Sequence, residues 1–446
     1  MPGPAAAGPA LSRAAGLKLA AMPRLPGTQG MVKIKVAGTG MDQDSTRRRY
    51  MDNAATSFPK PPQVADEMLR YAAEVGASAG RGAYREAIES GELIAECRRL
   101  LCRLFHGESP EHFIFALNCS DALNLAIRGM VDPRKMTHVI STEIDHNSVL
   151  RPLNALADEG WIEQTRVAVD PLTGFLEPAD IARAIRPHTR LLVITHASNV
   201  TGTLQPLRQI GALARERGIP LLVDAAQSAG RVPIDVQLDG VDLLAAPGHK
   251  GLLGPLGTGF LYIRPGLENV LRPLRQGGTG SVSEQDRQPD FLPDKFEAGS
   301  HNAIGIAGWR AGLQWLQQQT VEKVAAHEQA LSAAFLERIR EIEGLTFYGP
   351  QETQGRVGVF SVAVEGMAPA ELAARLEAEY GLLTRAGLHC APAIHRKLGT
   401  MARGGTTRFS FGPFLTVEDV RYAAEALAVI ARSARTPRKL DPCAVA

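Results

Sequence analysis

Short apolar runs alternate with amphipathic stretches along the chain from about Tyr50 to residue 308. The apolar runs have the length of strands, and the stretches between them carry apolar residues at helical spacing. Parallel strands that are buried on both faces of a sheet give this pattern. We therefore predict one large α/β domain over residues 65–308, with a mainly parallel sheet. Its expected strands lie within 112–117, 137–142, 162–169, 190–197, 219–227, 241–248 and 257–265.

The pattern changes after residue 308. Residues 306–344 form one long helical stretch, with a break expected near Thr320. Further on, strand-like and helix-like segments follow one another up to residue 435. We predict a smaller α+β domain over residues 309–435, which the segment 49–64 completes, and a loose tail over 436–446.

Residues 1–48 have a different composition from the rest of the chain. They are rich in Ala, Pro and Gly, and the first acidic residue is Asp42. We expect a disordered or low-complexity extension, and an organelle transit peptide remains an alternative because such peptides are also poor in acids.

Charge and composition exclude several classes of protein. The net charge is +2, from 49 basic and 47 acidic residues, which gives no reason to expect a nucleic-acid partner. No apolar stretch approaches the roughly 20 residues that span a bilayer, so no membrane partner is expected. Five cysteines, an odd number at wide spacing, argue against a disulfide framework and for a reducing compartment. We expect a soluble, cytoplasmic protein.

A carboxylate and a lysine follow two neighbouring apolar runs. Asp224 ends a run so apolar that both of its faces must be buried, and a buried carboxylate is costly unless a cation meets it. Lys250 lies after the next run, in a glycine-rich loop. A buried lysine has a lowered pKa and becomes a good amine nucleophile. A pyridoxal cofactor needs this pair, an amine to bind it and an anion at its ring nitrogen. Taken singly, Asp224 is better explained as a helix cap and Lys250 as a solvated loop residue, so the interpretation depends on the rest of the chain.

Several motifs occur in an order that is specific to one family. They are DNAAT (52–56), THASNVTGT (195–203), LLVDAAQSAG (221–230), GHKGLLGPLGTG (248–259), FEAGSHN (296–302) and RAGLHCAP (385–392). The sequence resembles the class V aminotransferase family of pyridoxal-phosphate enzymes, and within it the cysteine desulfurases and selenocysteine lyases. The resemblance implies the PLP-dependent transferase fold type I and pyridoxal 5'-phosphate as the cofactor.

The resemblance also implies roles for matching residues around the cofactor ring. Lys250 would be the Schiff-base lysine, and Asp224 the partner of the pyridine nitrogen. Gln227 would hydrogen-bond the phenolic oxygen. His146 would stack on the ring and take part in catalysis, although on its own it could be a surface loop histidine.

The cofactor phosphate is expected at the start of the helix that opens near residue 119, because free backbone N–H groups favour an anion there. The contacts would be Ser120 and the backbone of Cys119. Family members often carry hydroxyl side chains at the positions of Cys119 and Pro247, and both hydroxyls are missing here. We therefore expect His249 to contribute more of the binding of the phosphate. Ser300 resembles a residue that family dimers contribute to the neighbouring subunit's phosphate, which implies a homodimer; the alternative for Ser300 is a plain helix N-cap.

The choice of reaction depends on Cys390. It lies in a turn-prone segment beside His389 and near Arg385, and nearby cations lower the pKa of a thiol. We therefore interpret Cys390 as a catalytic nucleophile. Two alternatives are an inert buried cysteine and a metal site with His389 and His395; we predict no metal.

The resemblance then implies a cysteine desulfurase. L-cysteine would be bound through Arg408, with Asn199 and Arg385 as further substrate contacts, and converted to L-alanine with a persulfide on Cys390. A sulfur-acceptor protein would take the sulfur, for iron–sulfur cluster assembly, RNA thiolation or cofactor synthesis. The alternatives are a selenocysteine lyase, a class V aminotransferase or lyase in which Cys390 is not catalytic, and a sulfur-carrier scaffold. No GxGxxG motif follows a strand and opens a helix, which disfavours a dinucleotide oxidoreductase.

Overall fold

The computed structural model describes residues 47–80, 82–282 and 284–435. The chain separates into two units, residues 1–43 and 44–446, and all described residues lie in the second. The predicted tail over 436–446 and nearly all of the predicted extension over 1–48 therefore lie outside the described residues.

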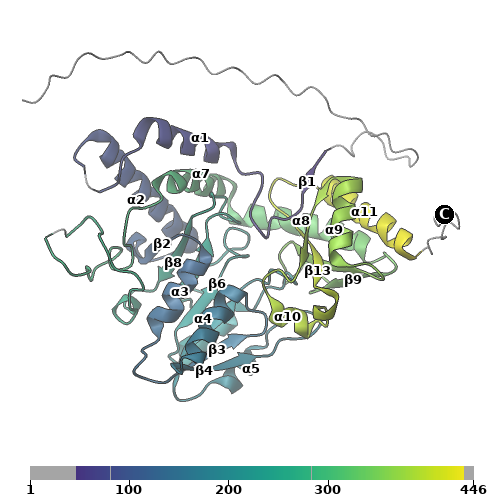
Figure 1. The fold of residues 1–446 in the computed structure, drawn as a ribbon, viewed down its shortest axis with the longest axis horizontal. Helices are drawn as coiled ribbons and strands as arrows, with labels where there is room; N and C mark the ends of the chain where they lie inside the picture. Colours follow the sequence, from purple (N-terminus) through teal and green to yellow (C-terminus); the bar gives the residue numbers. More distant parts are fainter. Residues whose placement is uncertain (1–46, 81, 283, 436–446) are drawn as a thin grey trace, which may run out of the picture. The chain divides into compact units, whose positions relative to one another are not determined.

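A seven-stranded sheet forms the first half of the fold (Figure 1). Its strands are β2 (Phe113–Ala116), β3 (Thr137–Thr142), β4 (Ile162–Val167), β5 (Thr189–Thr195), β6 (Leu221–Asp224), β7 (Leu243–Pro247) and β8 (Gly259–Ile263). The order is β2-β8-β7-β6-β5-β3-β4, and β8 alone runs in the opposite direction to the other six strands. The mainly parallel sheet predicted from the apolar runs is confirmed.

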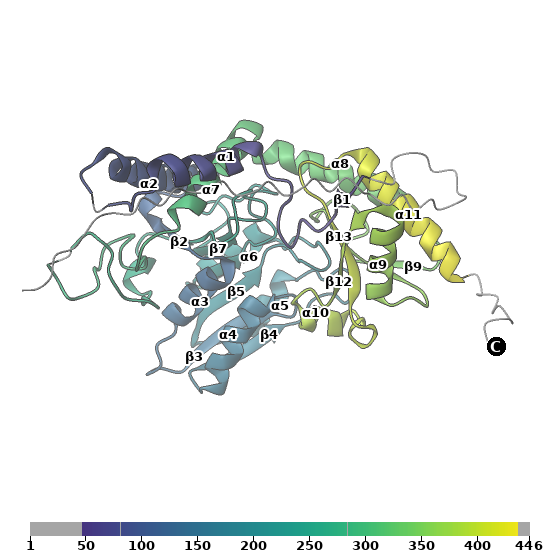
Figure 2. The ribbon, with the colours of Figure 1, turned by 45° about the horizontal axis from the view of Figure 1, so that its top comes forward.

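Helices cover both faces of this sheet, because alternate strand residues point to opposite faces. On β7, Leu244 packs into one cluster of buried side chains with α2 and α7, whereas Leu243 packs into another with α3 and α4. Figure 2 shows α2 and α7 above the sheet and α3 and α4 below it. The helices of this part are α1 (Pro62–Arg70), α2 (Arg85–Phe105), α3 (Cys119–Met130), α4 (Asn147–Asp158), α5 (Pro178–Ala184), α6 (Leu207–Glu216) and α7 (Ala303–Gln319).

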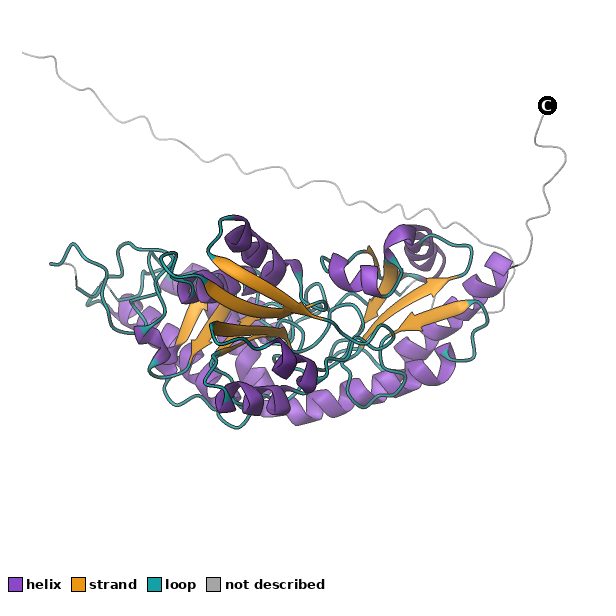
Figure 3. Ribbon diagram, turned by 90° about the horizontal axis from the view of Figure 1, so that it is seen from below, coloured by secondary structure: helices purple, strands orange, loops and turns teal. Residues whose placement is uncertain are grey.

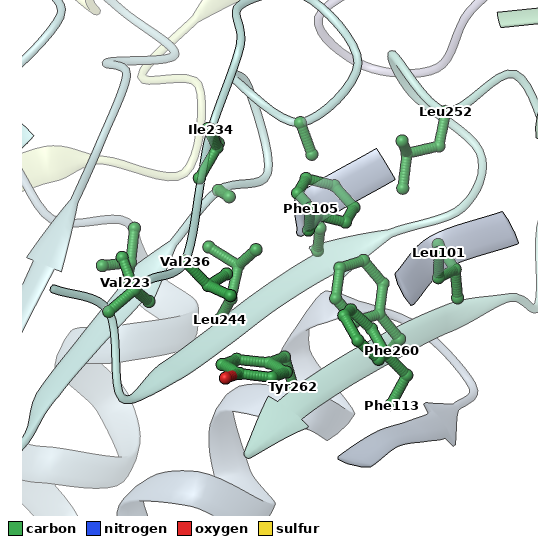
Figure 4. Close-up of a cluster of buried hydrophobic side chains, with 14 of the residues drawn as sticks. Leu101, Phe105, Phe113, Val223, Ile234, Val236, Leu244, Leu252, Phe260 and Tyr262 are labelled. Carbon is green, nitrogen blue, oxygen red and sulfur yellow. The ribbon is translucent and has the colours of Figure 1, made fainter. Parts of the chain in front are cut away.

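Aromatic side chains fill the core between the sheet and α2 (Figure 4). The ring of Phe260, on β8, lies 5.3 Å from that of Phe105, 5.6 Å from that of Phe113 and 6.3 Å from that of Trp309. These rings join β8 to α2, β2 and α7, so this part of the core determines how the helices of one face sit on the sheet.

Phe260→Ala should therefore lower the free energy of unfolding by about 3–5 kcal/mol, because it removes a fully buried ring and leaves a cavity. Denaturant titration of the protein would measure the change. Leu172→Ala is the matched control: its side chain is 75% exposed, and a change within about 0.5 kcal/mol is expected. Equal effects of the two substitutions would contradict the assignment of this core.

A smaller antiparallel sheet follows, of order β12-β13-β10-β9. Figure 3 shows the strands gathered in two groups, each lined by helices. Apolar side chains of α8, α9 and α11 pack on the second sheet in a buried cluster of their own. The elements are β9 (Leu345–Tyr348), β10 (Val359–Val364), β12 (Arg385–Gly387), β13 (Thr406–Ser410), α8 (Val321–Ile339), α9 (Pro369–Tyr380), α10 (Pro392–Lys397) and α11 (Val417–Arg435).

Two features bear on the predicted division of the chain. Thr320, at a φ of 64°, ends α7 and caps α8, which confirms the expected break in the long helical stretch. The strand β1 (Arg49–Tyr50) pairs with β11 (Leu382–Leu383), so the segment after residue 48 joins the second half of the fold. The predicted boundary at residue 308 falls inside α7, and the division into two domains stays a prediction. None of the described helices is long and apolar enough to cross a membrane.

Candidate active site

The carboxyl ends of β2, β3, β5, β6 and β7 meet at one edge of the large sheet, where α/β folds bind ligands. The loops that follow these strands line a cavity of about 360 Å³. The structure brings eight of the predicted site residues together there: Cys119, Ser120, His146, Asn199, Asp224, Gln227, His249 and Lys250.

Asp224 lies at the end of β6 and is only 2% exposed. Its Oδ1 accepts the backbone N–H of Ala226 at 2.9 Å, and the thiol of Cys119 lies 3.6 Å from the same oxygen. Burial raises the pKa of Asp224, while the Ala226 bond and Lys250 lower it. The carboxylate is therefore placed to receive a cationic group of a ligand.

Lys250 follows β7 by three residues and lines the same cavity. Burial lowers the pKa of its ammonium, and the nearby carboxylate of Asp224 raises it in part. The peptide that precedes Lys250 is held firmly: the carbonyl of His249 accepts the backbone N–H of Ser57 at 3.0 Å and the ammonium of Lys60 at 3.2 Å. A partly buried amine on a fixed backbone can act as a nucleophile and as a base.

The two histidines of the cavity are held in their neutral form. Burial, followed by repulsion from Lys250, lowers the pKa of both His146 and His249 to about 4. The Nδ1 of His146 accepts the N–H of Ser148 at 3.0 Å and thereby caps α4, so its proton resides on Nε2. His146 therefore presents a neutral ring and one N–H donor.

Two buried polar atoms of residues that line this cavity have no hydrogen-bond partner among the described residues. They are the Oδ1 of Asn199 and the Nδ1 of His249. Buried polar atoms in native proteins are nearly always satisfied. Their gathering at one cavity, beside Asp224 and Lys250, fits a polar ligand that carries both donors and acceptors, and pyridoxal phosphate meets that requirement.

The start of α3 supplies an anion-binding element at the cavity. Asn118 caps this helix by accepting the N–H of Asp121, and Cys119 and Ser120 form its first turn. The exposed Ser120 hydroxyl lies 2.6 Å from that of Ser148. Free N–H groups and the helix dipole at this point favour a phosphate.

Gln227 lines the cavity, but both ends of its amide already have partners. Its Nε2 donates to the carbonyl of Ala54 at 2.8 Å, and its Oε1 accepts from Arg231 at 3.3 Å. The second N–H of the amide is left for a ligand, whereas the oxygen, which could accept a second hydrogen bond, already faces Arg231.

Cys390 lies at the rim of the cavity rather than in its wall. Its carbonyl accepts the N–H of Asn147, next to His146, and the carbonyl of His389 accepts the side chain of Asn199 at 2.6 Å. The thiol is exposed, which contradicts the alternative of an inert buried cysteine. The two loop residues have φ values of 49° and 58°, in a region that non-glycine residues rarely adopt.

The cation beside the thiol is Arg385, whose Nη2 lies 3.8 Å from Sγ. His389 does not act as a second cation, because burial lowers its pKa to about 2. Its Nε2 lies 3.1 Å from the carbonyl of Thr406. Within the described part of the chain, no group of three His, Cys, Asp or Glu residues could hold a metal ion.

Arg408 is only 1% exposed, in β13 within the smaller sheet, and is not a surface cation. Its guanidinium donates to the carboxylate of Asp52 at 2.6 Å and to the carbonyl of Asn199 at 3.2 Å. Its Nε has no partner among the described residues, and Arg385 lies opposite it across the strand pair. Asp52 offsets one of these two positive charges, so the arginine pair keeps a net positive charge that would attract a second carboxylate.

Four predicted site residues do not line this cavity: Arg385, Cys390, Arg408 and Ser300. The first three are joined to its lining residues by the contacts given above, and Ser300 is not. Ser300 is exposed and lines a separate cavity near the start of α7. The N-cap of α7 is Asn302, whose side chain accepts the N–H of Gly305, so Ser300 is not a plain helix cap.

Sequence reasoning missed several contacts that build the site. Asp52, in the DNAAT motif, pairs with Arg408, and Lys60 holds the backbone beside Lys250. Asp145 is fully buried and ties the ends of β3 and β5 by accepting the N–H groups of Thr142 and Thr195. The motif pointed to Asp52, but nothing in its spacing identified its partner.

Comparisons with known proteins agree with this geometry. The aminotransferase class-V family model matches residues 49–422. A probable cysteine desulfurase from Methanothermobacter thermautotrophicus is 34% identical over 384 residues, which cover 86% of this chain and 94% of that protein. A cysteine desulfurase from Yersinia pseudotuberculosis is 34% identical over 350 residues, which cover 77% of this chain and 84% of that protein.

Among solved structures, the apo cysteine desulfurase from Thermococcus onnurineus is similar, with a TM-score of 0.80 at 29% identity; the match covers 86% of this chain and 95% of that one. Together with the mainly parallel sheet, this similarity confirms the predicted fold class. Since the family model matches more than half of the chain and the relatives match over most of their own length, the chain belongs to the class V aminotransferase family.

Proposed function

We propose that this chain is a pyridoxal-phosphate-dependent cysteine desulfurase that converts L-cysteine to L-alanine and leaves the sulfur as a persulfide on Cys390. The observation that carries the proposal is the meeting of Asp224 and Lys250 in one cavity, with an exposed thiol anchored at its rim. The relatives named above are cysteine desulfurases or probable ones.

The lining residues would hold the cofactor in distinct ways. Lys250 would bind its aldehyde carbon covalently, Asp224 would pair with the protonated ring nitrogen, and Gln227 would donate to the ring oxygen. The start of α3 would hold the phosphate, and the neutral ring of His146 would lie against the cofactor. When bound, pyridoxal phosphate draws electrons away from the α-carbon of an amino acid attached to it.

Lys250 is the base that we propose for the α-proton of the substrate. Because burial lowers its pKa, more of the free amine exists near neutral pH than for an exposed lysine. His146 and His249 have pKa values of about 4 and remain neutral at that pH, so neither repels the proton that Lys250 accepts.

Cys390 is the nucleophile toward the substrate sulfur. Its thiolate attacks that sulfur, a sulfur–sulfur bond forms, and the carbon–sulfur bond breaks. The electron pair of the broken bond passes to the substrate carbon, which takes up a proton and becomes the methyl group of alanine. Exposure of Cys390 then leaves the persulfide open to a sulfur-acceptor protein.

Arg408 is the proposed binding group for the substrate carboxylate, with Asn199 and Arg385 beside it. Arg408→Lys should raise the KM for L-cysteine by about 10- to 100-fold with a smaller effect on kcat, because lysine keeps the charge but cannot make a two-pronged contact. Steady-state kinetics of alanine release would measure both constants. Arg421→Lys, on an exposed face of α11, is the control. An unchanged KM in Arg408→Lys would contradict the assignment.

A homodimer is part of the proposal, and it explains the place of Ser300. This residue lies outside the cavity that Lys250 lines, so it would serve the phosphate of the partner subunit. Gel filtration that shows an active monomer would exclude this role. A cytoplasmic location also stays a prediction.

The deciding experiment uses the full chain reconstituted with pyridoxal phosphate. L-cysteine is added, and L-alanine and protein-bound sulfane sulfur are measured; equal amounts of the two in the first turnover are expected. L-selenocysteine is assayed in parallel, and turnover of that substrate alone would favour a selenocysteine lyase. Bound cofactor without alanine from either substrate would overturn the proposal.

A further inference from the structure

A buried arginine outside the cavity contacts one of the cofactor-binding candidates. Arg231 is 6% exposed, and its Nε donates to the carboxylate of Glu328, on α8, at 2.8 Å. Its Nη1 lies 3.3 Å from the Oε1 of Gln227, and its Nη2 lies 3.5 Å from the carbonyl of Phe411. Glu328 is 7% exposed and also accepts the N–H of Gly358 at 2.6 Å. The guanidinium is therefore held on all sides by acceptors.

This arrangement determines which way the amide of Gln227 faces. Arginine has five donors and no acceptor, so only the oxygen of the amide can face it. The Nε2 then faces the carbonyl of Ala54, at 2.8 Å, and one N–H remains. Without Arg231, the amide could turn over and offer its oxygen to the cavity instead.

Arg231 also lies directly behind the lysine loop. A Cβ on Gly251, the residue after Lys250, would lie 2.8 Å from the Cγ of Arg231 and would clash with the carbonyl of Ala229. Arg231, Lys250 and Glu328 all line one small cavity on this side. The contact between these segments is thus tight, and the arginine has little freedom to move.

We propose that Arg231, fixed by Glu328, is a positioning residue for the cofactor: it holds the Gln227 amide so that an N–H, and not the oxygen, is offered to the ligand. The inference rests on the proposed function, since it concerns the affinity for pyridoxal phosphate. It goes beyond that function because it assigns a part in cofactor binding to the ion pair between Arg231 and Glu328, on α8.

The test is a double-mutant cycle read out by the dissociation constant of pyridoxal phosphate from the apoprotein. Arg231→Met alone would leave the Glu328 carboxylate buried without its partner, which endangers folding. The pair Arg231→Met with Glu328→Gln is therefore used, because the glutamine oxygen can still accept the N–H of Gly358. The cycle compares this pair, Gln227→Ala, and the three substitutions together.

The pair and Gln227→Ala should each raise the dissociation constant by about three- to tenfold, the loss of one hydrogen bond. The triple variant should be no weaker than Gln227→Ala alone, because both changes remove the same contact. Effects that multiply in the triple variant, or a pair that binds like the wild type, would overturn the inference. Failure of the wild type to bind pyridoxal phosphate would instead overturn the proposed function.

A second buried ion pair controls for a merely structural effect. The Nε of Arg49 lies 3.0 Å from the Oδ1 of Asp419, and both side chains are 3% exposed. Neither residue lines the cavity. Arg49→Met with Asp419→Asn should lower the melting temperature without changing the dissociation constant. A rise in the dissociation constant equal to that of the Arg231 pair would show a general loss of stability and would overturn the inference.

Discussion

Lys250→Ala should lower kcat for alanine formation by about 10²- to 10⁴-fold, the contribution that a positioned base makes to a proton transfer. The substitution removes both the amine that would bind the cofactor and the base that would take the α-proton. The rate of alanine release from L-cysteine measures the fall in kcat. Borohydride reduction of the wild-type holoprotein, followed by peptide mapping, should place the label on Lys250.

Lys60 is the other lysine that could bind the cofactor covalently, so the labelling experiment distinguishes between it and Lys250. Burial lowers the pKa of Lys60 to about 8, which makes it the other reactive lysine near the cavity. Yet its ammonium donates to the carbonyl of Ser57 at 3.1 Å, to the Ser57 hydroxyl at 2.8 Å and to the carbonyl of His249 at 3.2 Å. These bonds use all three of its donors and keep the nitrogen from attacking a carbonyl carbon. Label on Lys60, or on no residue, would contradict the proposed site.

Cys390→Ser should abolish persulfide formation and most alanine formation while the protein still binds pyridoxal phosphate. A serine hydroxyl stays protonated near neutral pH, whereas a thiol is partly ionised and intrinsically more nucleophilic. Absorbance would monitor the bound cofactor, and mass spectrometry of the wild type after one turnover should find the extra sulfur on Cys390. Full alanine production by the variant would favour an aminotransferase or lyase in which this cysteine is incidental.

Two other thiols serve as controls for this result. Cys119 lines the cavity, but burial raises its pKa well above the usual range, so it should carry no extra sulfur. Cys102, on α2, donates to the carbonyl of Gly107 and does not line the cavity. Cys102→Ala should keep its alanine production, and loss of activity there would indicate a general effect of cysteine removal.

The sequence could predict the elements because their periodicity is local. The run that ends at Asp224 and the run that ends at Pro247 became β6 and β7, and the chemistry followed from their shared carboxyl edge. Thr320 broke the long helical stretch where the pattern weakened. Each element that was predicted from the periodicity of its own segment is present in the fold.

The contacts between distant segments could not be predicted in this way. Asp52 and Arg408 lie 356 residues apart in the chain, and Arg231 and Glu328 lie 97 apart. The first pair forms because the chain at Asp52 bridges Ser410 on β13, and the second because α8 packs against the segment after β6. No local spacing records either contact. His389 was expected to act as a cation, but the tertiary structure buries it and keeps it neutral.

The backbone at Cys390 has a consequence for how sulfur would leave the protein. His389 and Cys390 are successive residues in the left-handed region, and their carbonyl oxygens accept from the side chain of Asn199 and the backbone N–H of Asn147. An outward movement of this turn would break both hydrogen bonds. We therefore expect the acceptor protein to bring its own reactive group to Cys390, so the rate of sulfur release should rise with the acceptor's concentration until the complex of the two proteins is saturated.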